Sequence, residues 1–378
     1  NEFLKQTTPE KLASRGVSDP QRVAKIEEYR LEARAHRALA YYHMMDLFGK
    51  APFVTENDPI NTAGPEYNRQ QLFDFVESEL LEILPNLKAP RTNEAGRLDQ
   101  GFARMILAKI YLNAEVYVNE NRYADCAEQC NAIIAGGYTL NPNYLNNFKA
   151  DNNLSSEMIF AIQSDGNVTQ NFGPTTVMIN GSVGSIEQNG ASLGVGAGGW
   201  GGALRLRKQF VQKFDGTDFE NDARNTIISG SRIIEITDVA DRDSGYILAK
   251  FSNVSSTGVP GPNSTFVDTD FPLFRLADAY LMYAECALRG AGSESIALGY
   301  VNSLRERANN GSTAANITAS EMTLDFILDE RARELHWESH RRQDLIRFNK
   351  YTGGIYNWAW KGNGANGISI PSHLKLYP

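Results

Sequence analysis

The chain has 378 residues, enough for two average domains or one large one, and enough to bury a substantial core. Its formal net charge of −8, with only short basic runs, argues against a nucleic-acid partner, because a phosphate backbone requires concentrated positive charge. No apolar run approaches the roughly 20 residues of a membrane-spanning helix. The cysteine spacing on a helical pattern favours small buried thiols over a disulfide for Cys126, Cys130 and Cys286.

Apolar residues recur at helical spacing in the first part of the chain. Residues 27–48 place leucine, alanine, tyrosine and methionine three to four positions apart, which is typical of an amphipathic helix. Gly49 ends this pattern, and Pro52 prevents a restart. The same spacing predicts further helices at about 70–84, 99–117 and 123–134.

Residues 150–271 mostly lack the helical spacing of apolar residues that is found on either side. Short β-like runs (MIFAIQ, TTVMI, RIIEIT and YILAKF) are separated by clusters of Gly, Asn, Ser and Asp, and one helix is expected at RLRKQFVQKF. Loops of this length inside a compact protein are uncommon and are usually functional. We therefore interpret the segment as a loop-rich insertion carried on a helical scaffold.

Three strong helical patterns follow the insertion: PLFRLADAYLMYAECALRG, SESIALGYVNSLRERA and MTLDFILDERARELHWESHRRQDLIRF. The first two resemble an earlier pair, ARMILAKIYLNAE with YADCAEQCNAIIAGGY, and small residues on the first helix of each pair are typical of tetratricopeptide-like packing. We predict a mainly α fold for one domain, residues 1–378. Its parts are a helical scaffold at 1–149 and 272–350, the loop-rich insertion with short strands at 150–271, and a C-terminal segment at 351–378.

A glycine-rich stretch, GVGAGGWGG at residues 194–202, contains a single bulky side chain, Trp200. It matches the GxGxxG spacing of a phosphate loop, but it lacks both a preceding buried strand and a following Lys-Ser/Thr. A nucleotide site is therefore not predicted, and the stretch is expected to be a pliable mount for the tryptophan.

Two histidines in HWESH, His336 and His340, are spaced one helical turn apart, as a zinc-binding pair would be. The metalloprotease order is H-E-x-x-H, however, and here Glu338 occupies the wrong position. The simpler interpretation is a charged helix with ion pairs among Glu334, Glu338, Arg341 and Arg342. We predict no metal site at this position.

A glycoside hydrolase needs two carboxylates across a cleft. Five acids of the insertion could supply such a pair, but no spacing singles out two of them: Asp165, Glu187, Asp215, Asp241 and Asp243. DRDSG, beginning at Asp241, resembles part of a calcium loop but lacks its terminal glutamate, so a calcium ion there has no support and no cofactor is predicted. The serines of GSVGS do not fit a nucleophile elbow.

Several segments, in this order, resemble the SusD/RagB family, the outer-membrane nutrient-binding lipoproteins of Bacteroidetes. EARAHRALAYYHMMDLFGKAPFVTE is similar to the first long helix of that family and the turn after it, and FRLADAYLMYAECAL to its central helix. ILDERARELHWESHRRQDLIRF resembles the most recognisable segment of the family. The resemblance extends over nearly all of the chain.

The resemblance implies a non-enzymatic, lipid-anchored protein of the outer membrane at the cell surface. It would capture an oligosaccharide or polysaccharide and deliver it to a SusC-like TonB-dependent porter. Its lipid would lie on an N-terminal segment outside this chain, and we expect the native protein to be longer at both ends. Two alternatives stay open: an all-helical glycoside hydrolase, and a helical-repeat adaptor that binds a protein or peptide.

A glycan-binding face needs aromatic platforms for sugar rings and polar side chains for their hydroxyl groups. Trp200 is the first candidate, with a packing plug between helices as the alternative. The loop after the first helix is the second, because proteins of the resembled family often place ligand contacts there, and Phe172 in QNFGP is the third. Trp358 and Trp360 are expected to pack against the scaffold. The predicted glycan-binding residues are Trp200, Tyr67, Asn61, Asp58 and Phe172.

Overall fold

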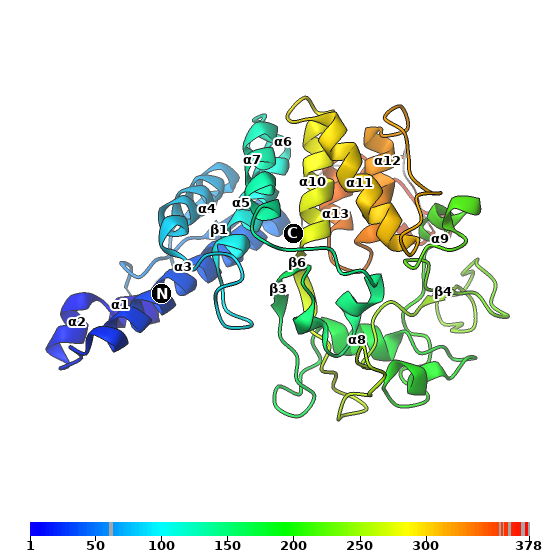
Figure 1. Ribbon diagram of the computed structural model, residues 1–378, viewed down its shortest axis with the longest axis horizontal. Helices are drawn as coiled ribbons and strands as arrows, with labels where there is room; N and C mark the ends of the chain where they lie inside the picture. The colour runs from blue at the N-terminus through cyan, green and yellow to red at the C-terminus, as the bar shows by residue number, and fades with distance from the viewer. Residues whose placement is uncertain (60–62, 355–356, 358, 362–363, 372–374, 377–378) are drawn as a thin grey trace. The chain divides into compact units, whose positions relative to one another are not determined.

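The computed structural model describes residues 1–378 except 60–62, 355–356, 358, 362–363, 372–374 and 377–378. The chain forms two compact units, one built on Asn1–Gly137 and the other on Tyr138–Ser372. Figure 1 shows the helices and strands of both, coloured along the chain. The prediction of a mainly α fold is confirmed, since in the described part of the chain strands occur only as three short pairs.

The first unit is built around one long helix, α3 (Pro20–Phe48). The side chain of Asp19 accepts a hydrogen bond from the N–H of Arg22 at the beginning of α3, and Gly49, with φ 72°, ends it as expected. The helix begins earlier than the predicted residue 27, because Asp19 followed by a proline is itself a strong start signal. The other helices of this unit are α1 (Glu2–Gln6), α2 (Pro9–Ser14), α4 (Arg69–Ile83), α5 (Gln100–Leu112), α6 (Ala114–Tyr117) and α7 (Tyr123–Ile134).

Helical pairs form the core of the first unit. Helix α3 packs along α4, and α5 packs along α7. Helix α5 is buried on almost every side, which explains its nearly continuous apolar sequence. Strand β1 (Lys50–Pro52) pairs antiparallel with β2 (Glu66–Asn68) and closes the base of the loop that follows α3.

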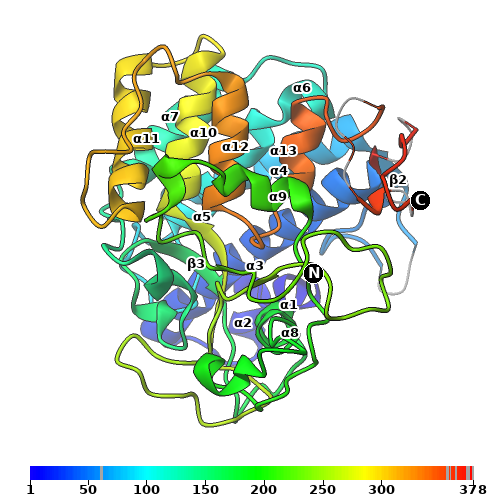
Figure 2. The same ribbon diagram turned by 90° about the vertical axis from the view of Figure 1, so that its right-hand side faces the viewer.

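The second unit contains a row of four helices, yellow to orange-red in Figures 1 and 2: α10 (Leu276–Leu288), α11 (Glu294–Ala308), α12 (Leu324–Glu334) and α13 (Arg341–Arg347). Helix α10 packs against α11 and α12. Most of the loop-rich segment, with α8 (Pro174–Gly181), lies below these helices in both views, whereas α9 (Lys208–Val211) lies closer to α12. Strands pair antiparallel as β3 (Met158–Ile162) with β6 (Phe271–Arg275), and as β4 (Ile227–Ile228) with β5 (Ile247–Leu248).

The insertion has its own hydrophobic core, so it is more than a set of surface loops. Buried side chains from the middle and end of the segment meet Tyr144 and Phe148, which lie just before it, and the partly buried Trp337 packs against this core. Among its members are Tyr144, Phe148, Ile179, Val183, Leu193, Val195, Phe251 and Val267. The insertion can therefore hold its exposed side chains in fixed positions.

Two local predictions for the insertion were wrong. TTVMI, expected as a strand, lies in α8, because Pro174 occupies the first turn of a helix and packing overrides the β-branched preference. RIIEIT forms no strand in the structure, and the paired residues are Ile227 and Ile228 just upstream. The expected helix at RLRKQFVQKF is limited to α9 and one 3₁₀ turn, Gln212–Phe214. MIFAIQ contains β3, as predicted.

The last long helical pattern was predicted as one helix and is two. Helix α12 ends at Glu334 and α13 begins at Arg341, and between them Trp337 (φ 59°) and Ser339 (φ 68°) adopt the left-handed conformation. The break moves Glu338 into the interior, where the side chains of Arg275 and Lys250 donate hydrogen bonds to its carboxylate. A continuous helix could not deliver this carboxylate to those partners.

The interior of the second unit holds an ionic network centred on the carboxylates of Glu334 and Glu338. Ion pairs at these two acids were expected, but their partners come from other segments instead of Arg341 and Arg342. Because these charges are buried, each must be paired to be tolerated. The cations that pair with the two acids are Arg224, Arg275, Arg307 and Lys250.

Cys126, Cys130 and Cys286 are buried and form no disulfide bond with one another, as the sequence predicted. Among the residues that the structure describes, no helix combines the length and the apolar character needed to cross a membrane.

Candidate functional site

Two of the predicted residues, Phe172 and Trp200, lie together on the insertion. Their ring centroids are 6.4 Å apart, and the ring of Phe266 lies 5.2 Å from that of Phe172 in an edge-on arrangement. Phe172 is 65% exposed, whereas Trp200 and Phe266 are partly buried. We call Phe172, Trp200 and Phe266 the aromatic cluster. Phe266 is not among the residues predicted from the sequence, because a phenylalanine at this position is equally consistent with ordinary core packing.

Short polar turns hold the two phenylalanines of the aromatic cluster. The side-chain oxygen of Asn171 accepts a hydrogen bond from the N–H of Gly173 at 2.7 Å, which fixes the chain just before α8. Asn263 accepts hydrogen bonds from the N–H groups of Thr265 and Phe266 at 2.8 and 3.0 Å. Both turns are local, so the rings are presented by their own loops.

The glycine-rich loop around Trp200 is closely packed, contrary to the pliable mount that was expected. The N–H of Trp200 donates to the carbonyl of Asn180 at 2.9 Å, next to the end of α8. Gly199 has φ 42°, and a Cβ atom there would lie 2.5 Å from the side chain of Val183. The glycine therefore serves close backbone approach to the end of α8, and these contacts fix the backbone that carries Trp200.

Exposed polar groups lie near the aromatic cluster. The guanidinium of Arg242 donates to the carbonyl of Trp200 at 3.2 Å, and Arg242 is exposed. Aromatic rings at a partly exposed position combine an apolar face with, for tryptophan, an N–H donor. This arrangement can stack on the apolar face of a sugar ring and offer hydrogen bonds to its hydroxyl groups.

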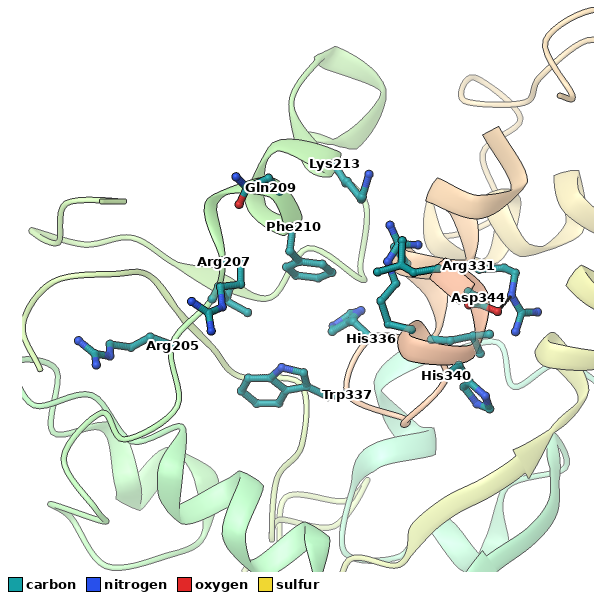
Figure 3. A pocket seen from close by; sticks show the side chains of 15 residues that line it. Arg205, Arg207, Gln209, Phe210, Lys213, Arg331, His336, Trp337, His340 and Asp344 are labelled. Carbon is teal, nitrogen blue, oxygen red and sulfur yellow. Dashed lines mark hydrogen bonds and ion pairs between the residues drawn. The ribbon is translucent and has the colours of Figure 1, made fainter. Parts of the chain in front are cut away.

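A second candidate feature is a cavity of about 330 Å³ between the segment 205–213 and the turn 335–340, both within the second unit. Figure 3 shows Arg207, Phe210, His336 and Trp337 around its open middle, with His340 pointing away. Arg207, Phe210 and Trp337 were not among the residues predicted from the sequence, and His336 was considered only as a zinc ligand within an expected helix. The only signal in the sequence was the basic run RLRK beside an aromatic residue.

Two of the loop carboxylates considered for catalysis, Asp165 and Glu187, serve local contacts. Asp165 accepts hydrogen bonds from the N–H groups of Asn167 and Val168 at 2.8 and 2.7 Å. Glu187 pairs with Arg232 at 2.9 Å, and this pairing lowers the pKa of its carboxyl. Within the described residues, no three His, Cys, Asp or Glu side chains gather as metal ligands would.

Comparison with known proteins identifies the family. The sequence model described as the SusD family matches residues 235–373. The starch-binding protein SusD of Bacteroides thetaiotaomicron is 33% identical to the chain in an alignment that covers all of this chain and 72% of that protein. The chain belongs to the SusD family.

Other SusD-like proteins agree with this assignment. The SusD-like protein P25 of Formosa agariphila is 27% identical, over 91% of this chain and 68% of its own. The surface glycan-binding protein A of Bacteroides uniformis shares the fold with a TM-score of 0.72 at 22% identity, over 100% of this chain and 78% of its own. The protein of that name from Bacteroides thetaiotaomicron, solved in complex with laminarihexaose, gives 0.70 at 22% identity, over 94% and 75%.

The other predicted contacts of this SusD family member lie in the first unit, on the loop after α3. Asp58 accepts hydrogen bonds from the N–H and hydroxyl of Thr55 at 2.7 and 3.0 Å, and these bonds hold the pKa of its carboxyl below the usual value. Tyr67 stacks on Phe53 with ring centroids 4.0 Å apart. Asn61 lies outside the described residues. The roles of all three in ligand binding stay predictions.

Of the two tryptophans near the C-terminal end, only Trp360 is among the described residues. Trp358 lies outside the described residues. The side chain of Trp360 is partly buried, but its indole N–H donates to the carbonyl of Ile236 at 2.7 Å, so this contact is with the insertion instead of the expected scaffold.

Proposed function

We propose that this protein is a non-enzymatic glycan-binding protein of the cell surface, and that the aromatic cluster is part of its glycan-binding face. The observation that carries the proposal is the pair of rings at Phe172 and Trp200 on the insertion of a SusD family member. Phe172 is 65% exposed, which leaves its ring available to a ligand.

Two similar proteins support glycans as the ligand class. One relative is a starch-binding protein, and one protein of the same fold was solved with a laminarihexaose. Stacking on rings tolerates many sugars, so the neighbouring polar side chains would select among glycans. We propose that this face takes an oligosaccharide or polysaccharide. We also propose that Asp58, Asn61 and Tyr67, on the loop after α3, are glycan contacts within the first unit.

The wider role follows from the family. We propose that the chain functions as one SusD-like domain, that a lipid on an N-terminal segment anchors the protein to the outer membrane, and that a SusC-like TonB-dependent porter receives the glycan. A preformed binding face would give moderate affinity and still permit release to the porter.

Native affinity electrophoresis in gels containing starch, laminarin or other polysaccharides tests this proposal, together with a reducing-end assay on the same polymers. We expect retardation in at least one gel and no release of reducing ends. Cleavage of a retarding polymer would favour the glycoside hydrolase. Absence of retardation throughout, with capture of a protein partner, would favour the adaptor.

A further inference from the structure

The cavity beside the turn 335–340 has an excess of positive charge. Its lining contains one carboxylate, Asp344, and the five cations Arg205, Arg207, Lys213, Arg331 and Arg341. Arg331 pairs with Asp344 at 2.9 Å, and Lys213 and Arg341 both pair with a carboxylate just outside the lining, Asp329. These pairs leave the charges of the segment 205–207 as the main surplus.

The guanidinium groups of Arg205 and Arg207 bind backbone carbonyls instead of carboxylates. Arg205 donates to the carbonyl of Val239 at 2.7 Å, and Arg207 donates to that of Ala359. Partial burial lowers the pKa of Arg207, and repulsion from Arg205 lowers it further. Within the described residues, neither forms an ion pair with an acid. A bound anion would relieve this repulsion.

His336 presents a hydrogen-bond acceptor at the same cavity. Its Nδ1 lies 2.7 Å from the carbonyl oxygen of Arg333, and since a carbonyl can only accept, Nδ1 must carry the hydrogen. Burial holds the pKa of His336 well below its ordinary value, with Lys250 adding to the effect, so the ring is neutral. Its Nε2 therefore has a free lone pair.

The lone pair of His336 Nε2 lacks a partner in the described structure. The His336 side chain is only 6% exposed, and its Nε2 atom is buried and accepts no hydrogen bond there. The ring of Phe210 lies 4.9 Å away, centroid to centroid, and offers no donor. Leaving such an acceptor unsatisfied costs about 1–3 kcal/mol, which a ligand hydroxyl would recover.

The turn that carries His336 is strained and firmly held. Trp337 and Ser339 have φ of 59° and 68°, a conformation that costs a bulky side chain about 1–2 kcal/mol. Between them, Glu338 is anchored by Arg275 and Lys250, each at 2.6 Å. Strain that the surroundings hold in this way is common where a protein grips a ligand.

These features define one kind of ligand. A carboxylate suits the guanidinium of Arg207, a hydroxyl group suits Nε2 of His336, and a flat face of C–H groups suits the indole of Trp337 and the ring of Phe210. The volume of about 330 Å³ is at the lower end for small-molecule sites, which limits the ligand to about one sugar ring. We propose that this cavity binds a carboxylated sugar, such as a uronic acid, as a site separate from the aromatic cluster.

Isothermal titration calorimetry on the whole chain with glucuronate, glucose and inorganic phosphate, at one ionic strength, tests the proposal. We expect saturable binding of glucuronate, at least tenfold weaker binding of glucose because it lacks the carboxylate, and at least tenfold weaker binding of phosphate because it lacks the apolar face. Equal affinity for glucose and glucuronate, or for phosphate and glucuronate, would overturn it.

Variants locate the site. Arg207→Gln removes the charge of a guanidinium that forms no ion pair among the described residues, so the fold should persist, and we expect glucuronate to bind at least tenfold more weakly. Lys208→Gln is the matched control, because Lys208 pairs with Glu235 outside this cavity, and its affinity should equal that of the wild type. Equal losses in both variants would indicate a general charge effect and contradict the assignment.

Two further variants separate this site from the glycan-binding face. His336→Phe keeps a ring and removes the acceptor, so glucuronate should bind several-fold more weakly while the thermal transition stays cooperative. Phe172→Ala should leave glucuronate affinity unchanged, even if it abolishes retardation by polysaccharides. Loss of glucuronate binding in Phe172→Ala would place the ligand at the aromatic cluster and refute the second site.

Discussion

Arg275 and Glu338 form a doubly hydrogen-bonded ion pair in the interior of the second unit. Nε of Arg275 lies 2.6 Å from Oε2 of Glu338, and Nη2 lies 2.9 Å from Oε1, with both residues 1% exposed. The pair joins the end of β6 to the turn between α12 and α13. It therefore fixes the backbone on which His336 and Trp337 sit.

Replacing Glu338 by Gln should lower the free energy of unfolding by about 3–5 kcal/mol, because it leaves Arg275 and Lys250 buried beside a neutral group. Urea denaturation followed by circular dichroism measures the change. Asp325→Asn is the control, because its pair with Lys350 is largely exposed and should contribute at most about 1 kcal/mol. Similar losses in both variants would contradict the importance of the buried pair.

Asp270→Asn should change how stability depends on pH. Burial raises the pKa of Asp270 to about 6, and its carboxylate accepts the N–H of Ser164 at 2.8 Å. Between about pH 4 and 6 the folded protein keeps a proton that the unfolded chain releases, so this carboxyl reduces stability as the pH rises. The variant should therefore gain up to about 3 kcal/mol relative to wild type between pH 4 and 7.

Thermal unfolding of wild type and Asp270→Asn at pH 4, 5 and 7 measures this effect. The prediction fixes the sign of the pH dependence: the Tm of the variant minus that of the wild type must increase with pH. A difference that is constant across these values would show that Asp270 is ionised in the folded protein throughout the range.

Phe172→Ala should weaken polysaccharide binding about two- to tenfold, because a favourable ring contact contributes about 0.5–1.5 kcal/mol. The thermal transition should stay within about 1 °C, because Phe172 is 65% exposed and supports little packing. Retardation in affinity gels measures the loss. Val168→Ala, which truncates an 81% exposed side chain on the same insertion, serves as control and should bind normally.

Tyr67→Phe tests the predicted ligand contact on the loop after α3. The ring stacked on Phe53 remains in this variant, so the Tm should not change. If the hydroxyl binds a sugar, as the sequence analysis predicts, retardation should decrease by a few-fold, in line with about 0.5–1.5 kcal/mol for one hydrogen bond. Retardation equal to that of the wild type would assign Tyr67 to packing alone.

The long helices could be predicted because their signals are local. Apolar spacing and a glycine cap are enough to locate α3, and the same spacing locates α10 and α11. The break after α12 could not be predicted, because its cause is a carboxylate drawn toward Arg275 and Lys250, which are distant in sequence. Local pattern contains no information about such partners.

The candidate sites, too, could be predicted only where their signals are local in sequence. Phe172 and Trp200 could be selected individually, because aromatic residues in glycine- and asparagine-rich loops are poor candidates for core packing. Their proximity to each other and to Phe266 depends on how the insertion folds on itself. The cavity beside His336 could not be predicted at all, because it exists only where the helical pattern fails.

The close packing of Gly199 against Val183 has a consequence for the thermodynamics of ligand capture. Because the loop that carries Trp200 is ordered by its hydrogen bond to Asn180 before any ligand arrives, little conformational entropy remains to be lost when a sugar stacks on the indole. Weak contacts can then suffice for binding. Evolution toward a new sugar is correspondingly easier by exchanging exposed side chains such as Phe172 than by altering the glycines beneath them.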